Sequence, residues 1–516
     1  MDRFATQALA EYNSDDKTVR HGGQNGRVFW NTHASQFMFV PAFQFRFLRP
    51  AEEYIYTATD CNGKQHSFTD TSSCAPLTPI WKDIPVGIVE LKVEVRHMVD
   101  HKIYSIGSRT FYKTAPFPGR DALPKKACSY RECAIKAFRY AFRDPSSQYW
   151  LQYGKPDPEY YHNVYPSKMI DSLVRAMISY SKLEPEMASQ ALQLAKNAAD
   201  YLLSITYSDE YALAGMPPTY SFKGLNKETV NRTAPAAEGR QHQVMMIYPA
   251  MVGSMYLALE EETGDKKYFD AAYRIAEHYK KTVLPSGSWY LMVTADTNEP
   301  ETVNCCNNFS LLEFMNAIYH RTGEACWHEL ERNYFSYLCK TYLENYNWEG
   351  QFEDSKLTEG YLNLTHIEAD KMISYIAANM ADDPEMVKEA EQLMRFVEDQ
   401  FVVWGDFAPW SIRGDARWYS PAGLEQYFWY VPIDANTAAI IKAFLDLYSV
   451  THDELLLEKA CALGDSITRM QEPVSGVIPT HWMKEDCATN LDNFWINCHI
   501  GTAFSMMKLA EVMGEI

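Results

Sequence analysis

Several chemical signatures are missing from this sequence of 516 residues. It has 11 cysteines, an odd number, and no C-x-x-C pair, so we expect neither a disulfide framework nor a zinc site of the usual spacing. It also has no H-E-x-x-H motif and no glycine-rich phosphate loop, and nothing in it demands a metal or an organic cofactor. We therefore expect no cofactor and no metal, with any chemistry carried by ordinary side chains.

Positive charge and long apolar runs are also scarce. The formal net charge of −19 disfavours nucleic acid and anionic membrane surfaces as partners. No stretch of 18 apolar residues occurs, so we expect no transmembrane helix. The opening residues, MDRFATQALAEYNSDD, lack the apolar core of a signal peptide. The sequence leaves open a cytoplasmic or periplasmic location in a bacterium, and whether the chain forms a homo-oligomer.

Aromatic residues, in contrast, are abundant. There are 34 Tyr, 25 Phe and 12 Trp residues, 14% of the chain, and many fall in expected loops rather than on the apolar faces of helices. The C–H faces of sugars stack on aromatic rings, while their hydroxyls need scattered polar partners. The pattern favours a carbohydrate-binding cleft, although many of these rings must also fill a large core.

Two architectures follow one another along the chain. After an N-terminal extension over residues 1–26, residues 27–114 show strand signals. Ile88–Val95 largely alternates apolar and polar residues, and Asn62-Gly63 is a strong hairpin turn signal. Several short strands predict a small immunoglobulin-like β-sandwich. Residues 115–127 are rich in proline and lack periodicity, which predicts a domain linker.

Residues 128–516 are predicted to be helical and repetitive. Gly264 and Gly323 each separate two helical segments and suit the left-handed cap between antiparallel helices. Six comparable first helices recur at intervals of roughly 60–80 residues. With an outer partner for each, they predict a mainly α (α/α)6 toroid, which as a closed ring needs no capping repeats; an open solenoid is the alternative. The six inner helices are expected to begin near Pro166, Pro249, Asn307, His366, Asp434 and Asn493.

The loops that lead into the inner helices should converge on one mouth of such a ring. Four of them carry tryptophan beside a polar or ionisable residue, which is unusual for a purely structural connector. We therefore expect the mouth to hold the substrate. The four loops are Ser286–Tyr290, Trp348–Asp354, Trp404–Trp410 and Gly476–Trp482.

Carboxylates in these loops are the catalytic candidates. Glycoside hydrolysis needs a protonated acid beside the leaving oxygen and a second carboxylate as base or nucleophile. Glu353, Asp354 and Asp406 lie closest to tryptophans, and Glu425 adjoins another aromatic stretch. Since Glu353 and Asp354 are adjacent, an extended chain would point at most one of them inward. Asp434, just ahead of a helical run, is more typical of a helix cap.

Binding residues are expected on the same rim. Arg240 and His242, in an insertion before one inner helix, suit a fork onto a substrate carboxylate. The histidines near inner-helix starts are individually more typical of hydrogen-bonded structural residues, but several on one rim favour binding. The remaining candidates are Tyr248, Trp289, Tyr290, Asn307, Trp348, His366, Trp404, Arg413, Tyr419, His481 and Trp482.

The order of an immunoglobulin-like domain and a toroid resembles gut-bacterial glycoside hydrolases and other uronic-acid-active enzymes. On architecture and loop character the chain most resembles glycoside hydrolase family 154, whose members are β-glucuronidases. The resemblance implies removal of a terminal β-glucuronic acid during polysaccharide degradation, with Arg240 and His242 on the uronate. Unsaturated glucuronyl hydrolases, polysaccharide lyases and N-acylglucosamine 2-epimerases share the toroid, so fold does not settle the reaction.

Three hypotheses remain open at this point. The first is a glycosidase that uses two of the loop carboxylates. The second is a uronate lyase or sugar epimerase, in which a histidine or tyrosine removes a proton; the candidate bases are His242, Tyr248, His366 and His481. The third is a glycan-binding protein without catalysis. The loop carboxylates beside aromatic residues favour the glycosidase, acting on a carbohydrate that contains uronic acid.

Overall fold

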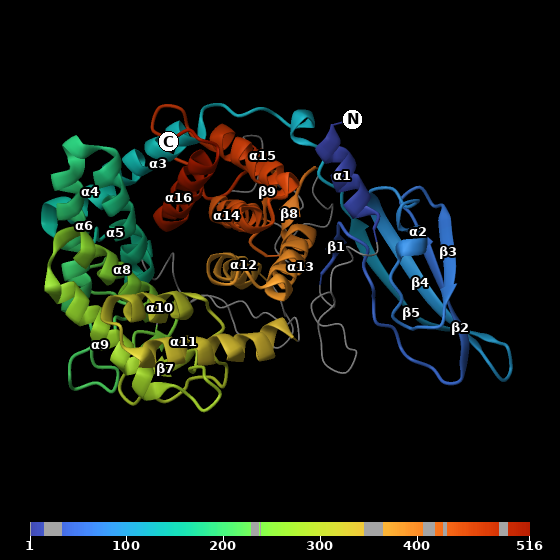
Figure 1. Ribbon diagram of the computed structural model, residues 1–516, viewed down its shortest axis with the longest axis horizontal. Coiled ribbons are helices and arrows are strands. Elements are labelled where there is room, and N and C mark those ends of the chain that lie inside the picture. The colour runs from blue at the N-terminus through green and yellow to red at the C-terminus, as the bar shows by residue number, and fades with distance from the viewer. Residues whose placement is uncertain are drawn as a thin grey trace.

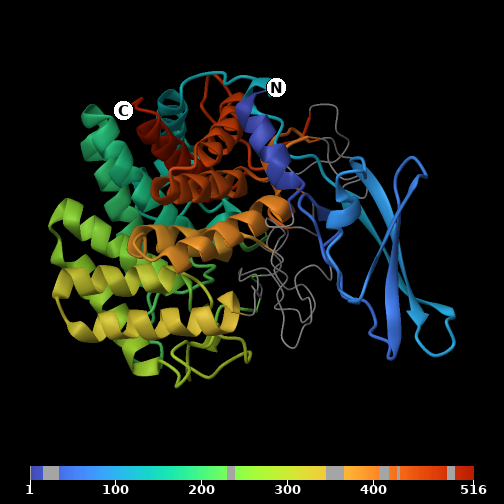
Figure 2. The same cartoon turned by 45° about the vertical axis from the view of Figure 1, so that its right-hand side comes forward.

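The computed structural model describes residues 2–14, 34–228, 237, 239–344, 365–405, 418–426, 431–484 and 494–516. A ring of helices forms the larger part, and a β-sheet stands beside it (Figure 1). Helix α1 (Arg3–Tyr12) lies between the two (Figure 2). None of the helices in the described ranges is long and apolar enough to cross a membrane.

Six inner helices of the described chain form a closed ring. Apart from the third and fourth, inner helices that follow one another in the sequence pack closely side by side, and the last helix packs against the first. Between the third and fourth helices, Asn316 Nδ2 donates to Asn379 Oδ1 over 3.4 Å. The predicted toroid is thus confirmed. The inner helices are α5 (Pro166–Leu183), α8 (Tyr248–Thr263), α10 (Ser310–Thr322), α12 (Ile367–Asn379), α14 (Asp434–Thr451) and α16 (Ile496–Val512).

Each inner helix carries an outer partner. Along the chain the outer helix follows the inner one on which it packs, except that α3 (Tyr130–Arg143) packs on α16 and so completes the last pair. A further helix, α4 (Pro145–Tyr153), packs against the outer layer. The other outer helices are α6 (Ala188–Ile205), α9 (Lys266–Thr282), α11 (Ala325–Leu338), α13 (Pro384–Phe401) and α15 (Glu454–Met470).

Turn chemistry fixes the reversals between inner and outer helices. Gly264 has φ +68° and Gly323 has φ +72°, a left-handed conformation that costs glycine little. Asp265 then caps α9 by accepting a hydrogen bond from Lys267 N over 3.2 Å. Between α8 and α10, Gly253 permits a close approach, because a Cβ there would lie 2.3 Å from the Phe314 ring.

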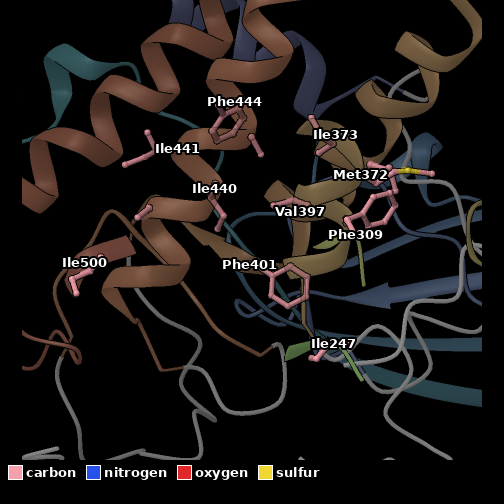
Figure 3. Close-up of a cluster of buried hydrophobic side chains, with 14 of the residues drawn as sticks. Ile247, Phe309, Met372, Ile373, Val397, Phe401, Ile440, Ile441, Phe444 and Ile500 are labelled. Atoms are coloured by element: carbon pink, nitrogen blue, oxygen red, sulfur yellow. The ribbon is translucent and has the colours of Figure 1, made fainter. Parts of the chain in front are cut away.

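The helical core lies where inner and outer faces meet. Figure 3 shows part of it between α12, α13 and α14, where Val397, Phe401, Ile440 and Phe444 pack together. All four side chains are fully buried. Burying a side chain of this size stabilises the fold by about 1.5–3 kcal/mol, so this wedge holds α13 against the ring.

The N-terminal region forms a five-stranded sheet in the order β1-β5-β4-β2-β3. Strand β1 runs parallel to β5 and the other neighbours are antiparallel. Gly63, at φ +79°, lies in the turn that joins β2 to β3, where the Asn62-Gly63 signal predicts a hairpin. The strands are β1 (Gln36–Phe37), β2 (Ala51–Thr59), β3 (Gln65–Asp70), β4 (Gly87–His97) and β5 (Ile103–Lys113).

This sheet corrects the prediction of an immunoglobulin-like sandwich. Residues 34–113 hold one sheet, whereas a sandwich needs two. The alternation in β4 buries only one face, and that face is covered by aromatic side chains from a loop and from the short helix α2 (Thr78–Trp81). Ring centroids of Trp81 and Phe43 lie 6.2 and 5.3 Å from that of Phe111. Alternation reveals a buried face but not what covers it.

Buried polar contacts join the sheet to the ring. The Asp399 carboxylate at the end of α13 accepts hydrogen bonds from Met38 N and Phe39 N, each over 2.7 Å. Beside it, Gln36 and Gln400 each donate from the side-chain amide to the other's backbone carbonyl, over 3.1 and 3.0 Å. The sheet therefore braces the outer layer next to α12.

Short elements fill the connections. Strand β6 (Gln243–Met245) pairs with β7 (Met292–Thr294), and β8 (Val402–Val403) pairs with β9 (Ala422–Gly423). They hold parts of the long loops in place between the helices. The remaining short helices are η2 (Arg120–Ala122), η3 (Tyr161–Val164), η4 (Pro185–Met187) and η6 (Cys339–Leu343).

Candidate functional site

A cavity of about 340 Å³ lies at the N-terminal ends of the inner helices. Five of the helices contribute residues from their N-terminal turns, and α10 is represented by Asn308, two residues before it begins. Helix N-termini carry partial positive charge and unpaired N–H groups, so their convergence favours an anionic ligand. The wall residues that matter below are Lys168, Tyr248, Asn308, Glu368, Lys371, Glu425, Asn436, His481, Trp495 and Asn497.

Glu368, in the first turn of α12, is a buried carboxyl group in this wall. Only 5% of the residue is exposed. Its Oε1 accepts from Asn308 Nδ2 over 2.8 Å and its Oε2 accepts from Phe309 N over 3.2 Å. Burial raises the pKa of Glu368, against the opposing effect of the Lys371 ammonium, whose Nζ lies 3.9 Å from Oε1. A carboxyl group with a raised pKa can serve as a general acid near neutral pH.

A second carboxylate, Glu425, lines the same cavity. It is half-buried, and its backbone N donates to Val431 O over 3.4 Å. The preceding residue, Leu424, is held by a hydrogen bond from its N to Phe401 O at the end of α13 over 2.8 Å. The cavity thus combines a shielded carboxyl on a helix with a less shielded one on a loop, an arrangement that can divide acid and base roles.

An aromatic and cationic wall faces the cavity just ahead of α16. The Trp495 ring stacks on His162, with centroids 3.5 Å apart, and lies 5.9 Å from the Tyr165 ring. Lys168 Nζ sits 4.7 Å from the Trp495 centroid. A fixed indole beside an ammonium group suits the apolar face of a sugar that also carries negative charge.

A buried hydrogen-bonded chain connects α12 to α14 at the same end of the ring. His366, fully buried at the start of α12, pairs through Nδ1 with Asp370. Its Nε2 lies 3.0 Å from Asn436 Nδ2, and Asn436 lines the cavity. His366 was predicted as a substrate-binding residue, but its ring lies behind the wall.

Of the residues predicted from the sequence, Tyr248, Glu425 and His481 line the cavity. Three others lie in the core instead. Trp289, Trp404 and Trp482 are no more than 3% exposed; Trp289 Nε1 donates to Tyr279 O over 2.8 Å, and Trp404 Nε1 donates to Glu398 Oε1 over 3.1 Å. Their rings are packed into the protein and cannot stack on a sugar in this arrangement.

The other predicted residues that fall within the described ranges do not line this cavity. Arg240 and His242 precede β6, whose pairing with β7 holds them, and the side chain of His242 is exposed. Asn307 is fully buried next to Asn308. The backbone of Tyr290 pairs with that of Cys305 in an isolated antiparallel β-bridge. Tyr419 N donates a hydrogen bond to Trp482 O over 3.0 Å. Five predicted residues lie outside the described ranges: Glu353, Asp354, Asp406, Trp348 and Arg413.

Sequence reasoning missed Glu368, Lys168 and Trp495. Glu368 and Lys371 resemble an ordinary i,i+3 pair on a helix surface. The available signal was that Glu368 lies on the apolar face of its helix. Trp495 was hidden because it immediately precedes a helix that was expected to begin near Asn493.

Among the residues that the structure describes, no group of three or more His, Cys, Asp or Glu side chains is arranged to hold a metal ion.

No protein-family model matches this chain, and no curated protein matches it in sequence. In structure it is similar to a family 76 glycoside hydrolase from a bovine Bacteroides thetaiotaomicron strain, at 10% identity and a TM-score of 0.46, over 92% of this chain and 100% of that one. A cellobiose 2-epimerase from Spirochaeta thermophila gives 13% identity, a TM-score of 0.48, and coverage of 70% and 89%. An unsaturated glucuronyl hydrolase specific for heparin gives 11% identity and a TM-score of 0.47, over 75% of this chain and 98% of that one. At these values the similarity assigns the chain neither to a family nor to a reaction.

Proposed function

We propose that the protein is a glycoside hydrolase that removes an acidic sugar, as a β-glucuronidase does, in the cavity at the N-terminal ends of the inner helices. The observation that carries the proposal is the buried Glu368 carboxyl group in a wall that also presents Glu425. Two carboxyl groups in different environments are what acid and base catalysis of glycoside hydrolysis requires.

In this proposal Glu368 is the general acid. Its raised pKa keeps a proton available, and that proton passes to the glycosidic oxygen as the bond from the anomeric carbon to that oxygen breaks. Glu425, in its less shielded position, is the second carboxylate. It acts either as the base that takes a proton from the water attacking the anomeric carbon, or as the nucleophile that attacks this carbon directly. In both routes one water is consumed, and the products are a free sugar and an alcohol.

The acidic character of the substrate is inferred from the cations in the wall. Lys168 and Lys371 line the cavity, and six helix N-termini point toward it. This local positive potential lies within a protein of net charge −19, so binding of an anion depends on the cavity itself. A uronic acid meets this requirement and presents a C–H face to Trp495.

A second candidate function is a lyase or an epimerase. Tyr248 and His481 line the same cavity, and either residue has the chemistry of a base that removes a proton next to a carboxylate or carbonyl group. Lys371 would then neutralise the developing negative charge. The two reactions differ in their products, because a lyase creates a carbon–carbon double bond that absorbs ultraviolet light.

The experiment that tests the proposal is a panel of p-nitrophenyl glycosides, run beside ultraviolet monitoring of uronate polymers. We expect release of p-nitrophenol from the β-glucuronide, much slower release from the β-glucoside, and no rise in ultraviolet absorbance from the polymers. A rise in absorbance without aryl glycoside hydrolysis would favour the lyase. Binding of glucuronate without turnover of any compound would favour a glycan-binding protein.

Replacing Lys371 by methionine should change both substrate preference and pH dependence. Without the ammonium group, the KM for the β-glucuronide is expected to rise roughly tenfold or more, with little change for neutral glycosides. Lys371 lowers the pKa of Glu368, so its removal raises that pKa. Because the acid works when protonated, the alkaline limb of kcat/KM should move to higher pH. Steady-state kinetics across pH measure both effects.

The matched control is Lys267→Met, which removes a lysine on the outer helix α9 that pairs with Asp200 over 2.8 Å. This variant should keep the wild-type KM and pH profile. If Lys371→Met and Lys267→Met behave alike, Lys371 has no role in the site.

A further inference from the structure

We infer that Asn436 recognises a hydroxyl group of the sugar, and that His366 and Asp370 are positioning residues that hold its amide in one orientation. The inference rests on the proposed function, since it places the substrate in the same cavity. It adds Asn436, a specificity-determining residue on α14, to a site whose two carboxyl groups come from α12 and from the loop before α14.

Hydrogen-bond chemistry fixes the direction of the chain. An amide nitrogen only donates, so Asn436 Nδ2 donates to His366 Nε2 across 3.0 Å. A ring nitrogen that accepts carries no proton, and the ring proton of the neutral imidazole therefore sits on Nδ1. It is donated to the Asp370 carboxylate one helical turn later.

Burial makes this arrangement rigid. His366 is fully buried, and Asp370 and Asn436 are nearly so. The Phe401 ring lies against the imidazole, with centroids 5.0 Å apart. Rotation of the Asn436 amide would place its oxygen against the unprotonated Nε2, so two acceptors would face each other in a site that water reaches poorly.

The consequence is a fixed acceptor for the ligand. With Nδ2 engaged by His366, Oδ1 of Asn436 remains, and among the described residues no donor reaches it. Asn436 lines the cavity that holds Glu368 and Glu425. A fixed amide oxygen accepts a hydrogen bond from a sugar hydroxyl and repels a carboxylate, so it orients the sugar with its carboxylate toward Lys168 or Lys371. A site of this type discriminates strongly against an analogue that lacks the hydroxyl.

The test combines binding with a direct view of the imidazole. Calorimetry gives the Kd for D-glucuronate, and nitrogen-15 NMR of labelled histidine reports the tautomer of His366, identified by its loss in His366→Gln. We expect Asn436→Ala to weaken glucuronate binding about tenfold and to shift the Nε2 resonance toward that of a free acceptor. Asp370→Asn should weaken binding several-fold and reduce the population with the proton on Nδ1.

The matched control is Asp465→Asn, since Asp465 is an equally buried carboxylate that accepts from Arg120 and Tyr130 far from the cavity. It should lower thermal stability without affecting Kd or tautomer. The inference would be overturned if Asn436→Ala bound glucuronate with the wild-type Kd. It would also be overturned if Asp370→Asn lost stability while the tautomer of His366 and the Kd stayed unchanged. If the wild type binds glucuronate but hydrolyses no glycoside, and Asn436→Ala weakens that binding, the inference stands and the hydrolase proposal fails.

Discussion

Glu368→Gln is expected to lower kcat for aryl β-glucuronides by about 10²–10⁴-fold, the usual contribution of a general acid. Glutamine keeps the size of the side chain, and its oxygen can still accept from one of the two donors, Asn308 Nδ2 or Phe309 N. The other donor loses its acceptor, which should lower stability by about 1–3 kcal/mol and leave the fold intact. It has no proton of suitable acidity to give to the leaving oxygen. KM should change little, because the substrate and the helix N-termini that bind it are unaltered.

The identity of the leaving group makes this prediction specific to an acid. A p-nitrophenolate leaves without much help, whereas an alkoxide needs a proton, so the loss should be smallest for p-nitrophenyl and largest for alkyl glucuronides. The matched control is Glu331→Gln. Glu331 is a buried glutamate on α11 that accepts from Tyr375 over 2.9 Å, and its replacement should leave kcat intact. A loss that is the same for all leaving groups would contradict the acid role.

Asp399→Ala is expected to cost about 3–5 kcal/mol in the free energy of unfolding. The carboxylate accepts from two backbone N–H groups of the segment that follows β1, and from Gln400 Nε2 over 2.6 Å. Alanine leaves all three donors buried without these acceptors. Asp399→Asn keeps one oxygen for Met38 and Phe39 and should cost less.

The pH dependence of this effect has a definite sign. Burial raises the pKa of Asp399 from 3.8 to about 7. Between these values the folded protein holds a proton that the unfolded chain releases, so this group makes stability fall as pH rises from about 4 to about 7. Both variants lack the titrating group and should lose that slope. Urea unfolding at several pH values measures it, and variants with the wild-type slope would show that Asp399 does not titrate in this range.

The ring was predictable because its signals are local. Gly264 and Gly323 mark reversals that any sequence window can show, and the repeated apolar faces give six helix starts within a few residues of those observed. Tyr248 could be placed at the mouth for the same reason, since it is the first residue of α8. His481 could be placed there because it lies in the loop that leads to the last inner helix. Predicting such a ring needs only the helical period of the apolar residues and the residues that cap the helix ends.

The site itself depends on contacts between distant parts of the chain. Burial raises the pKa of Glu368, and its Oε1 accepts a hydrogen bond from Asn308, which lies just before the neighbouring helix α10. Trp289 was expected at the mouth because it lies in a loop, but its indole N–H is taken by the backbone of α9. Loop position alone does not show whether an aromatic ring faces solvent or core.

The most direct test of the central claim is a crystal structure of Glu368→Gln soaked with p-nitrophenyl β-D-glucuronide. We predict density for the sugar in the cavity at the N-terminal ends of the inner helices, with the glycosidic oxygen within hydrogen-bond distance of residue 368 and the sugar face on Trp495. A sugar bound instead in the adjoining cavity that extends toward the C-terminal end of α10, among Arg175, His320 and Arg321, would contradict the claim.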